Sequence, residues 1–511
     1  MLLKRFLSII QLYIISIRII SVFSNGVPDI FIRNNNVKRS SKEIIIHFND
    51  TNFYNMETII NQNQNTNELI IRFVDNYYDL SLLWYSVELE IKANVSIIGN
   101  KNGTIFDFKG DHRGRVCFNF IKTENVAVKV ENLILQNFST QGVYIEKEII
   151  KVIAGKNDLQ VIFNNCVFRN NDYHIIQYDI HTNNGEIFPI TQFIFNECDF
   201  YNNKERLIFV YQHSDIRDYR SINMNVTKCN FINNRGLFFT FDSYLTIDDC
   251  YFSDVDRDSD LSFENVFYYS PIPSISKAVL DIKNSKFENI NVKSELPLIT
   301  ANNLILKIEN TSFKNCYSAY GYLFNIFYKF SIPHININNS TFTETSALFR
   351  GKALKLMISD TNFYNITINK YIPLLSDAKY SSVVVVNSKF DKISLMNGFV
   401  NEETSCSFYN TDLNNIKSSS NSLLYTKYHN IYIDGMNIEN VSCYGDGSFI
   451  LFETGDAENR LTIKNLNIKK SNFNGPFIKL EGNYGEVIFE NSNLSDVNTY
   501  GSIIKDKLEK I

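Results

Sequence analysis

One short phrase recurs along most of this chain: two apolar residues flanking a third residue, then Asn, a small residue and a Phe, with a second Asn two places later. It reads VIFNNCVFRN from Val161 to Asn170, LKIENTSFKN from Leu306 to Asn315 and LMISDTNFYN from Leu356 to Asn365. The Phe position returns every 21 to 35 residues. A repeat of this length, whose units can bury their apolar face only against one another, indicates a solenoid.

The pattern within each unit predicts what the solenoid is made of. The two apolar residues alternate with others, as Leu461 and Ile463 do, and this period of two predicts a β-strand with one buried face. Three places before the Phe stands Asn, Asp or Gly in most units, so we expect a bend with left-handed backbone there. Parallel strands joined by loops rather than helices need stacking into turns. We therefore predict an all-β, single-stranded, right-handed parallel β-helix of about 14 or more turns.

Two columns of side chains are expected along this stack. We expect the Phe side chains to stack inside as a core ladder, comprising Phe168, Phe200, Phe231, Phe252, Phe287, Phe313, Phe342, Phe363 and Phe390. We expect the second Asn of each unit to form a hydrogen-bonded Asn ladder, because stacked amides can satisfy one another. Its members are Asn170, Asn202, Asn233, Asn289, Asn315 and Asn365.

The phrase resembles the repeats of right-handed parallel β-helix proteins. It is similar to the pectin-lyase-like superfamily and, in its Asn-[Cys/Ser/Thr]-x-Phe part, to the repeats of polymorphic surface proteins. The resemblance covers roughly residues 90 to 504 and implies the fold. It does not imply one activity, since this solenoid carries lyases, hydrolases, adhesins and receptor ectodomains.

The flanking segments suggest a domain organisation. Residues 1–24 combine Lys4 and Arg5 with an apolar run and small residues, which indicates a signal peptide, with an uncleaved signal anchor as the alternative. We expect an N-terminal capping segment over 25–89, the parallel β-helix over 90–504, and a polar tail over 505–511 that suits a blunt end or a truncated chain. The prediction is an extracellular or cell-surface glycoprotein with no membrane span after the signal.

Charge and motifs exclude several functions. A net charge of -5 and a pI near 5.9 give no reason to expect nucleic acid as a partner. The paired carboxylates of glycoside hydrolases have only weak counterparts here, in Asn410-Thr411-Asp412 and Asp248-Asp249. Of these, Asn410 and Asp249 are turn residues of the repeat itself. The histidines are never spaced as metal ligands. No catalytic residue is predicted.

Two weaker patterns suggest binding sites. An acidic cluster, Asp254, Asp256, Asp258 and Asp260, alternates as carboxylates do in a calcium loop. However, Ser259 stands where such a loop has a Gly, and Asn265 where it has a Glu. A solvent-exposed loop between turns is the alternative. No other cofactor is expected. Candidate carbohydrate-stacking aromatics are Tyr268, Tyr269 and Tyr320, with core filling as the alternative.

Four cysteines occupy the small-residue position of successive units: Cys166, Cys198, Cys229 and Cys250. Stacked turns lie about 4.8 Å apart, and parallel register holds Cβ atoms farther apart than the ~3.8 Å that a disulfide prefers. We predict an inward ladder of free thiols, with disulfides as the alternative.

The predicted function is a secreted or cell-surface scaffold for binding or adhesion, non-catalytic, with polysaccharide or a surface protein as partner. A polysaccharide lyase or glycoside hydrolase of the pectin-lyase-like type is one alternative. The ectodomain of a larger membrane-anchored receptor is another.

Overall fold

The structure is a computed structural model. It describes residues 41–140, 148–156, 158–180, 190–212, 222–241, 243–257, 267–270, 279–293, 297–328, 332–445, 447–456 and 458–510. The predicted signal peptide lies outside these residues. Within them, no helix has both the length and the apolar character needed to cross a membrane. From Ser41 onward the chain forms one compact unit.

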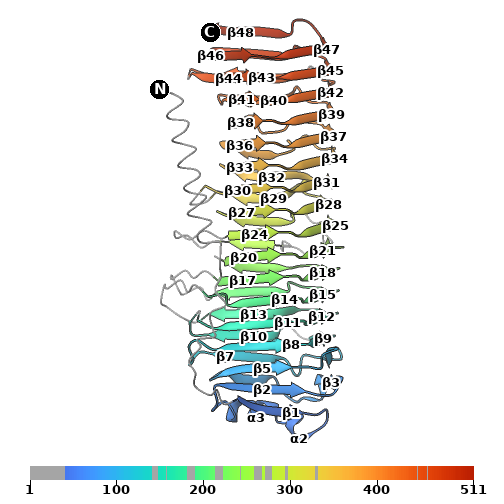
Figure 1. Cartoon of the computed structure of the whole chain (residues 1–511), viewed down its shortest axis with the longest axis vertical. Helices are drawn as coiled ribbons and strands as arrows, with labels where there is room; N and C mark the ends of the chain where they lie inside the picture. Colours follow the sequence, from blue (N-terminus) through green and yellow to red (C-terminus); the bar gives the residue numbers. More distant parts are fainter. Residues whose placement is uncertain are drawn as a thin grey trace. The chain divides into compact units, whose positions relative to one another are not determined.

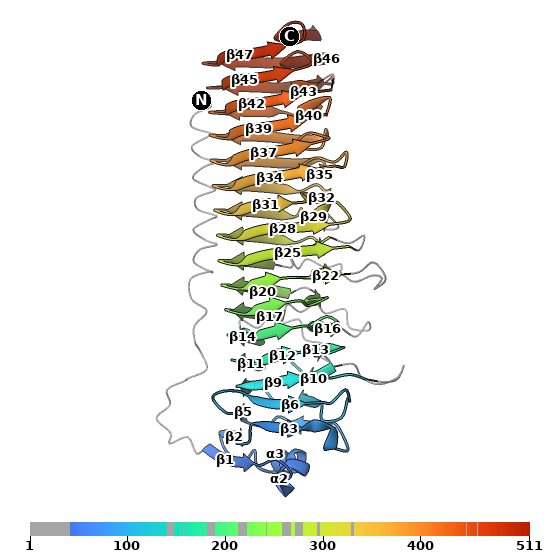
Figure 2. The same cartoon turned by 90° about the vertical axis from the view of Figure 1, so that its right-hand side faces the viewer.

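That unit is a parallel β-solenoid of about 15 turns, so the predicted all-β fold is confirmed. Figures 1 and 2 show the turns stacked along one axis, each turn contributing strands to different sides. Strands pair in parallel with the equivalent strands of the turns before and after.

Sheet A contains the strands with the two alternating apolar residues. These are β1 (Ser41–Ile46), β2 (Glu68–Phe73), β5 (Asn94–Ile98), β8 (Ala127–Glu131), β11 (Gln160–Asn164), β14 (Phe193–Asn196), β17 (Ile222–Thr227), β20 (Ser243–Asp248), β24 (Val279–Lys283), β27 (Ile305–Glu309), β30 (His334–Asn338), β33 (Lys355–Ser359), β36 (Ser381–Val386), β38 (Thr404–Tyr409), β41 (Ile431–Asp434), β44 (Asn459–Lys464) and part of β46 (Ile478–Glu490).

Sheet B contains the strands with the Phe position. These are β3 (Tyr77–Asp79), β6 (Thr104–Asp107), β9 (Leu133–Gln136), β12 (Val167–Arg169), β15 (Asp199–Tyr201), β18 (Asn230–Ile232), β21 (Tyr251–Ser253), β22 (Asp256–Arg257), β25 (Lys286–Val292), β28 (Ser312–Ser318), β31 (Thr341–Thr345), β34 (Asn362–Ile368), β37 (Lys389–Leu395), β39 (Asp412–Ser418), β42 (Asn437–Cys443), β45 (Asn467–Phe473) and β47 (Asn493–Thr499).

Sheet C completes each turn. Its strands are β4 (Val87–Glu90), β7 (Val116–Phe120), β10 (Glu148–Ala154), β13 (His174–Ile180), β16 (Ile208–Gln212), β19 (Phe238–Phe241), β23 (Phe267–Ser270), β26 (Ile299–Asn302), β29 (Tyr322–Phe327), β32 (Ala347–Lys352) and β35 (Ser376–Lys379). A fourth group, sheet D, plays this part in the last turns with β40 (Ser422–Lys427), β43 (Ser448–Thr454), β46 and β48 (Ile504–Lys510).

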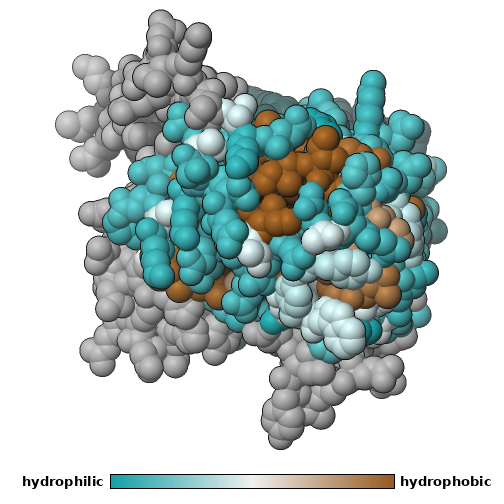
Figure 3. All heavy atoms as spheres, turned by 90° about the horizontal axis from the view of Figure 1, so that it is seen from below, coloured by the Kyte–Doolittle hydropathy of each residue, from teal (hydrophilic) through white to brown (hydrophobic). Residues whose placement is uncertain are grey.

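The N-terminal end of the stack carries short helices. α2 (Thr51–Tyr54) and α3 (Met56–Gln62) follow β1 and bury Phe53, Met56 and Ile60, and a 3-10 turn, η1 (Leu80–Leu82), follows β3. β1 already pairs in parallel with β2, so the stack begins at Ser41, inside the segment expected to cap it. Seen from below, this end is largely hydrophilic around patches of apolar side chains (Figure 3).

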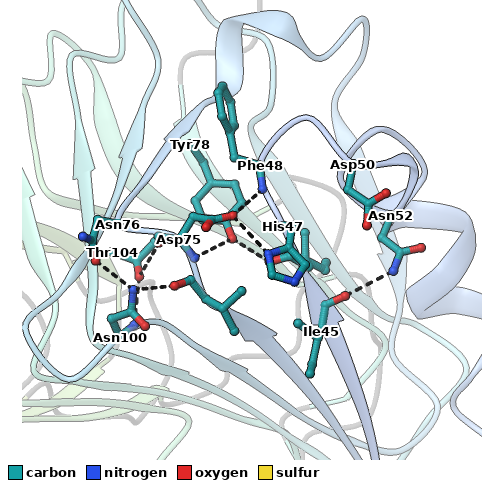
Figure 4. A network of polar contacts seen from close by, with 12 residues as sticks. Ile45, His47, Phe48, Asp50, Asn52, Asp75, Asn76, Tyr78, Asn100 and Thr104 are labelled. Atoms are coloured by element: carbon teal, nitrogen blue, oxygen red, sulfur yellow. Dashed lines mark hydrogen bonds and ion pairs between the residues drawn. The ribbon is translucent and has the colours of Figure 1, made fainter.

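Polar side chains fasten the first turns to one another (Figure 4). The N–H of Phe48 donates to Asp75 Oδ2 at 2.7 Å, and the Tyr78 hydroxyl donates to the carbonyl of Ile46 at 2.6 Å. The Asn100 amide donates to the Val74 carbonyl at 2.9 Å. These bonds join backbone groups of one turn to side chains of another where the first turns bend.

Inside the stack, Phe side chains of sheet B lie on one another. From Phe168 to Phe390, ring centroids of successive turns are 4.5 to 5.2 Å apart and their planes differ by at most 11°. These rings are at most 1% exposed. Their separation follows the spacing of the strands that carry them, so the stack is a consequence of parallel register.

The backbone bends on both sides of each stacked Phe. Asn165 and Asn170, three places before and two places after Phe168, have φ of 51° and 57°. Asn amides at these bends hydrogen-bond from turn to turn; Asn202 Nδ2 donates to Asn170 Oδ1 at 3.2 Å, and Asn233 Nδ2 to Asn202 Oδ1 at 2.7 Å. Asn tolerates left-handed backbone, and its amide completes the column, which explains its use at both bends.

All eight cysteines are free and buried. In the predicted thiol column, the N–H of Cys198 donates to Cys229 Sγ at 3.4 Å and that of Cys229 to Cys250 Sγ at 3.5 Å. Hydroxyl groups continue this column, because the N–H of Cys250 donates to Ser285 Oγ at 3.1 Å. Thiol and hydroxyl groups are therefore equivalent here, because both accept a hydrogen bond from an inward-facing backbone N–H.

Candidate functional site

A groove lies on the outer face of sheet B, where β9, β12, β15 and β18 stack. In-register neighbours Gln136, Arg169, Tyr201 and Ile232 occupy one outward column, because each directly follows an inward Leu or Phe. The groove has a volume of 510 Å³. Its lining consists of Gln136, Asn137, Arg169, Asn170, Tyr201, Asn202 and Ile232.

The floor of the groove at its N-terminal end is a chain of side-chain hydrogen bonds. Gln136 Nε2 donates to Asp107 Oδ2 at 2.9 Å, and Gln136 Oε1 accepts from Arg169 Nε at 2.8 Å. Asn137 Nδ2 donates to Asp107 Oδ1 at 2.9 Å. Gln136 is thus held in one orientation, and it fixes the position of the Arg169 side chain above it.

Asp107 remains ionised beneath the groove although it is only 4% exposed. Burial, the largest influence, raises the pKa of Asp107, but hydrogen bonds from Asn137, the Lys109 N–H and Gln136, with the nearby Lys109 charge, bring it below its ordinary value. These donors occupy both carboxylate oxygens of Asp107. Burial, followed by the charge of Asp199 and a hydrogen bond with it, raises the pKa of Tyr201, so the phenol lining the groove is neutral.

Only part of the predicted calcium segment lies within the residues that the structure describes. Asp254 is exposed on a bend with φ of 54°, Asp256 lies in β22 beside β25, and Asp258 and Asp260 lie outside the described residues. Among the residues described, no group of three or more His, Cys, Asp or Glu side chains is placed to hold a metal ion. Calcium at this segment stays a prediction.

The three predicted stacking tyrosines lie apart from the groove, on sheet C and just before β29. Tyr268 and Tyr269 are in β23, where their backbones pair with Thr300 and Ala301. The Tyr320 ring is half-buried, and the Arg350 guanidinium lies 5.0 Å from its centroid. One face of that ring is therefore covered by a cation of the protein itself.

The sequence reasoning did not single out Arg169 or Tyr201. Both stand one place after a Phe of the core ladder, in the position that alternation directs outward. Aligning that position across successive units would have placed Gln136, Arg169 and Tyr201 in one column. The depth of the groove could not have been read in this way, because it depends on the lengths of neighbouring side chains.

Comparisons with known proteins bear on the fold. No family model and no curated protein matches the chain. Among solved structures, a PL6 family polysaccharide lyase from Pseudopedobacter saltans is similar at 12% identity and a TM-score of 0.37, over 73% of this chain and 84% of that one. The catalytic domain of a GH87 alpha-1,3-glucanase in complex with nigerose is similar at 10% identity and a TM-score of 0.24, over 92% and 68%.

A third similar structure is tailspike protein 3 of bacteriophage CBA120, at 9% identity and a TM-score of 0.28, over 84% of this chain and 56% of that one. At these identities the likeness extends to the fold alone.

Proposed function

We propose that this protein binds a polysaccharide chain along the sheet B groove, the β-helix serving as its scaffold. The observation that carries the proposal is the composition of the groove: amides, one guanidinium and one phenol around an apolar side chain. Amide and guanidinium groups hydrogen-bond to sugar hydroxyls, while the flat face of Tyr201 and the Ile232 side chain suit the C–H face of a sugar ring. Small-molecule and sugar sites combine few polar groups with apolar surface in this manner.

The shape of the groove favours a chain over a single sugar. Its lining comes from four successive turns, so it runs along the stacking axis for about 14 Å. The lining is also rigid, because Arg169 and Gln136 are hydrogen-bonded to one another and Asn170 and Asn202 belong to the amide ladder. A preorganised site loses little conformational entropy on binding.

Removing the aromatic ring tests this site. We expect Tyr201→Ala to weaken polysaccharide binding by about fivefold or more, because the sugar loses a packing face and a hydrogen-bond donor. Tyr364→Ala is the matched control: Tyr364 occupies the same outward column, far along the stack and outside the groove lining. Binding of the purified protein to a glycan array, followed by calorimetry with the best ligand, provides the measurement. Equal losses in both variants would contradict the proposed location.

The enzyme alternative is tested with the same ligand. A scaffold returns the polymer intact, whereas a lyase or hydrolase produces unsaturated ends that absorb ultraviolet light or new reducing ends. Sustained turnover that Tyr201→Ala or Asp256→Asn abolishes would establish the enzyme in place of the scaffold.

We also propose export of the protein through residues 1–24, on the charge and apolar pattern given above. Secretion of a reporter fused to these residues tests export. A reporter retained in the cytosol would contradict it.

Whether the protein works as an ectodomain of a receptor is decided by the coding sequence downstream of Ile511. Calorimetric titration with Ca²⁺ tests the calcium prediction.

A further inference from the structure

Arg169 differs from most other arginines whose contacts the structure describes. Arg72, Arg113 and Arg115 each contact a carboxylate, at 2.6, 2.5 and 2.9 Å, and Arg460 contacts Glu486. Arg169 contacts the neutral Gln136 instead, and no carboxylate of the described residues lies within ion-pair distance of it. The groove therefore contains a positive charge that the protein does not neutralise.

The way Arg169 is held determines which atoms face the groove. Its Nε is used by Gln136 Oε1, which leaves the two terminal nitrogens, Nη1 and Nη2, without a protein partner in the described part of the chain. Two adjacent N–H donors in one plane match a group that presents two oxygens. The nearest acids do not compete for them, since Asp107 is occupied by Gln136 and Asn137.

Asp199, the other acid close to the groove, is also occupied, because Asn230 Nδ2 donates to its Oδ1 at 2.7 Å. No Asp or Glu belongs to the groove lining. A neutral sugar can accept hydrogen bonds from the guanidinium. A ligand that carries negative charge gains in addition from the unneutralised positive charge, so the groove favours an anionic ligand.

We propose that the ligand is an anionic polysaccharide and that one of its carboxylate or sulfate groups binds end-on to Nη1 and Nη2 of Arg169. This inference rests on the proposed sugar-binding function of the groove and names its ligand class. The outward Tyr201 and Asn202 of the next turn would then contact the hydroxyl groups of the same or the adjacent sugar.

The experiment uses four probes of equal length: an oligogalacturonate, its methyl ester, a sulfated oligogalactan and the unsulfated oligogalactan. Calorimetry with the full mature chain compares the original protein with Arg169→Gln, which removes the charge but keeps an amide beside Gln136, and with Arg169→Lys, which keeps the charge but loses the fork. Lys314→Gln is the control, because Lys314 is a cation in the same outward column outside the groove. Circular dichroism establishes that each variant is folded.

We expect at least one anionic probe to bind about tenfold or more tightly than its neutral counterpart. Arg169→Gln should bring binding of the anionic probe down to that of its neutral counterpart, Arg169→Lys should retain part of the preference, and Lys314→Gln should retain all of it. The carboxylate and the sulfate arms identify which anion is bound. Equal binding of charged and neutral probes by the original protein would overturn the anionic inference and leave sugar binding standing. Failure of all four probes, and of every sugar on the array, would overturn both.

Discussion

At the scale of single residues, three buried asparagines show how the solenoid satisfies its own backbone. Asn171, Asn203 and Asn234 stand one place after the outer Asn ladder and are at most 1% exposed. Asn203 Nδ2 donates to Asn234 Oδ1 at 2.8 Å and to the Phe168 carbonyl at 3.0 Å, while its Oδ1 accepts from Asn171 Nδ2 at 3.0 Å. The inner amides therefore take up groups that the bend leaves without sheet partners.

Asn203→Ala is expected to lower the free energy of unfolding by about 2 to 4 kcal/mol, because it leaves buried amide and carbonyl groups of two adjacent turns without partners. Asn202→Ala, one residue earlier and exposed, should cost about 1 kcal/mol, since water replaces its hydrogen bonds and only the left-handed backbone is strained. Denaturant unfolding of both variants measures the difference. Equal costs would mean that the inner ladder has no special role.

The inner ladder could not be foreseen from these residues. In pairs of adjacent asparagines such as Asn170-Asn171 and Asn202-Asn203, the first Asn matches the repeat, so the sequence predicts it as a member of the outer ladder. The second Asn resembles an ordinary loop residue. Which amide faces inward depends on how sharply the backbone turns at the first one. Left-handed φ at Asn170 and Asn202 reverses the direction in which the next side chain points.

At the scale of elements, the column before the Phe shows why cysteine, serine and threonine exchange in this repeat. Most of these side chains accept the N–H of the equivalent residue in the preceding turn, as Ser285 Oγ does from Cys250. Each also donates to the carbonyl two places earlier, as Cys250 Sγ does to Asp248 at 3.3 Å. Small size and a donor–acceptor atom are the requirements, and the thiol has no redox function in this role.

Consequently, the thiols are expected to be inert in the folded protein. Burial raises the pKa of Cys316 and Cys406 to about 12 and that of Cys117 to about 11, so the reactive thiolate is scarce at neutral pH. A thiol reagent should label fewer than one cysteine per native chain and all eight after denaturation without reductant. Labelling of only four in denaturant would mean that the other four are disulfide-linked.

At the scale of the whole molecule, the sequence predicts the turns of the solenoid where the repeated phrase is complete. It does not predict them where the phrase is missing. Leu461, Ile463 and Ile468 show the alternation clearly, and they lie in sheets A and B as expected. The first turns lack the phrase, so the sequence predicts a cap where the structure has β1 and β2. Ile71 and Phe73 of β2 nevertheless pack in the core of the solenoid. The groove also escaped prediction, because four turns each contribute one or two residues that are ordinary in isolation.

The two ends of the stack differ, and this predicts where it opens first. At the N-terminal end α2 and α3 cover the core with Phe53 and Ile60, which are at most 2% exposed. At the other end the column of Ile463, which is fully buried, terminates in Phe489 at 38% exposure, and that of Ile478 terminates in Ile504 at 43%. In a solenoid each turn is stabilised by its two neighbours. In the chain of 511 residues, the turn of β47 and β48 has one neighbour and exposed apolar side chains, so we expect it to open at low cost.

Hydrogen exchange measured by mass spectrometry follows this opening. We expect backbone amides of β47 and β48 to exchange more than about tenfold faster than those of β25 and β28, which have partners on both sides. β3 serves as the control: like β47 it has a partner strand on one side only, but Phe53 of α2 packs against its buried Tyr78, so it should remain protected. Equal protection of β47 and β3 would show that the exposed C-terminal turn is covered in solution, by a partner or a second copy.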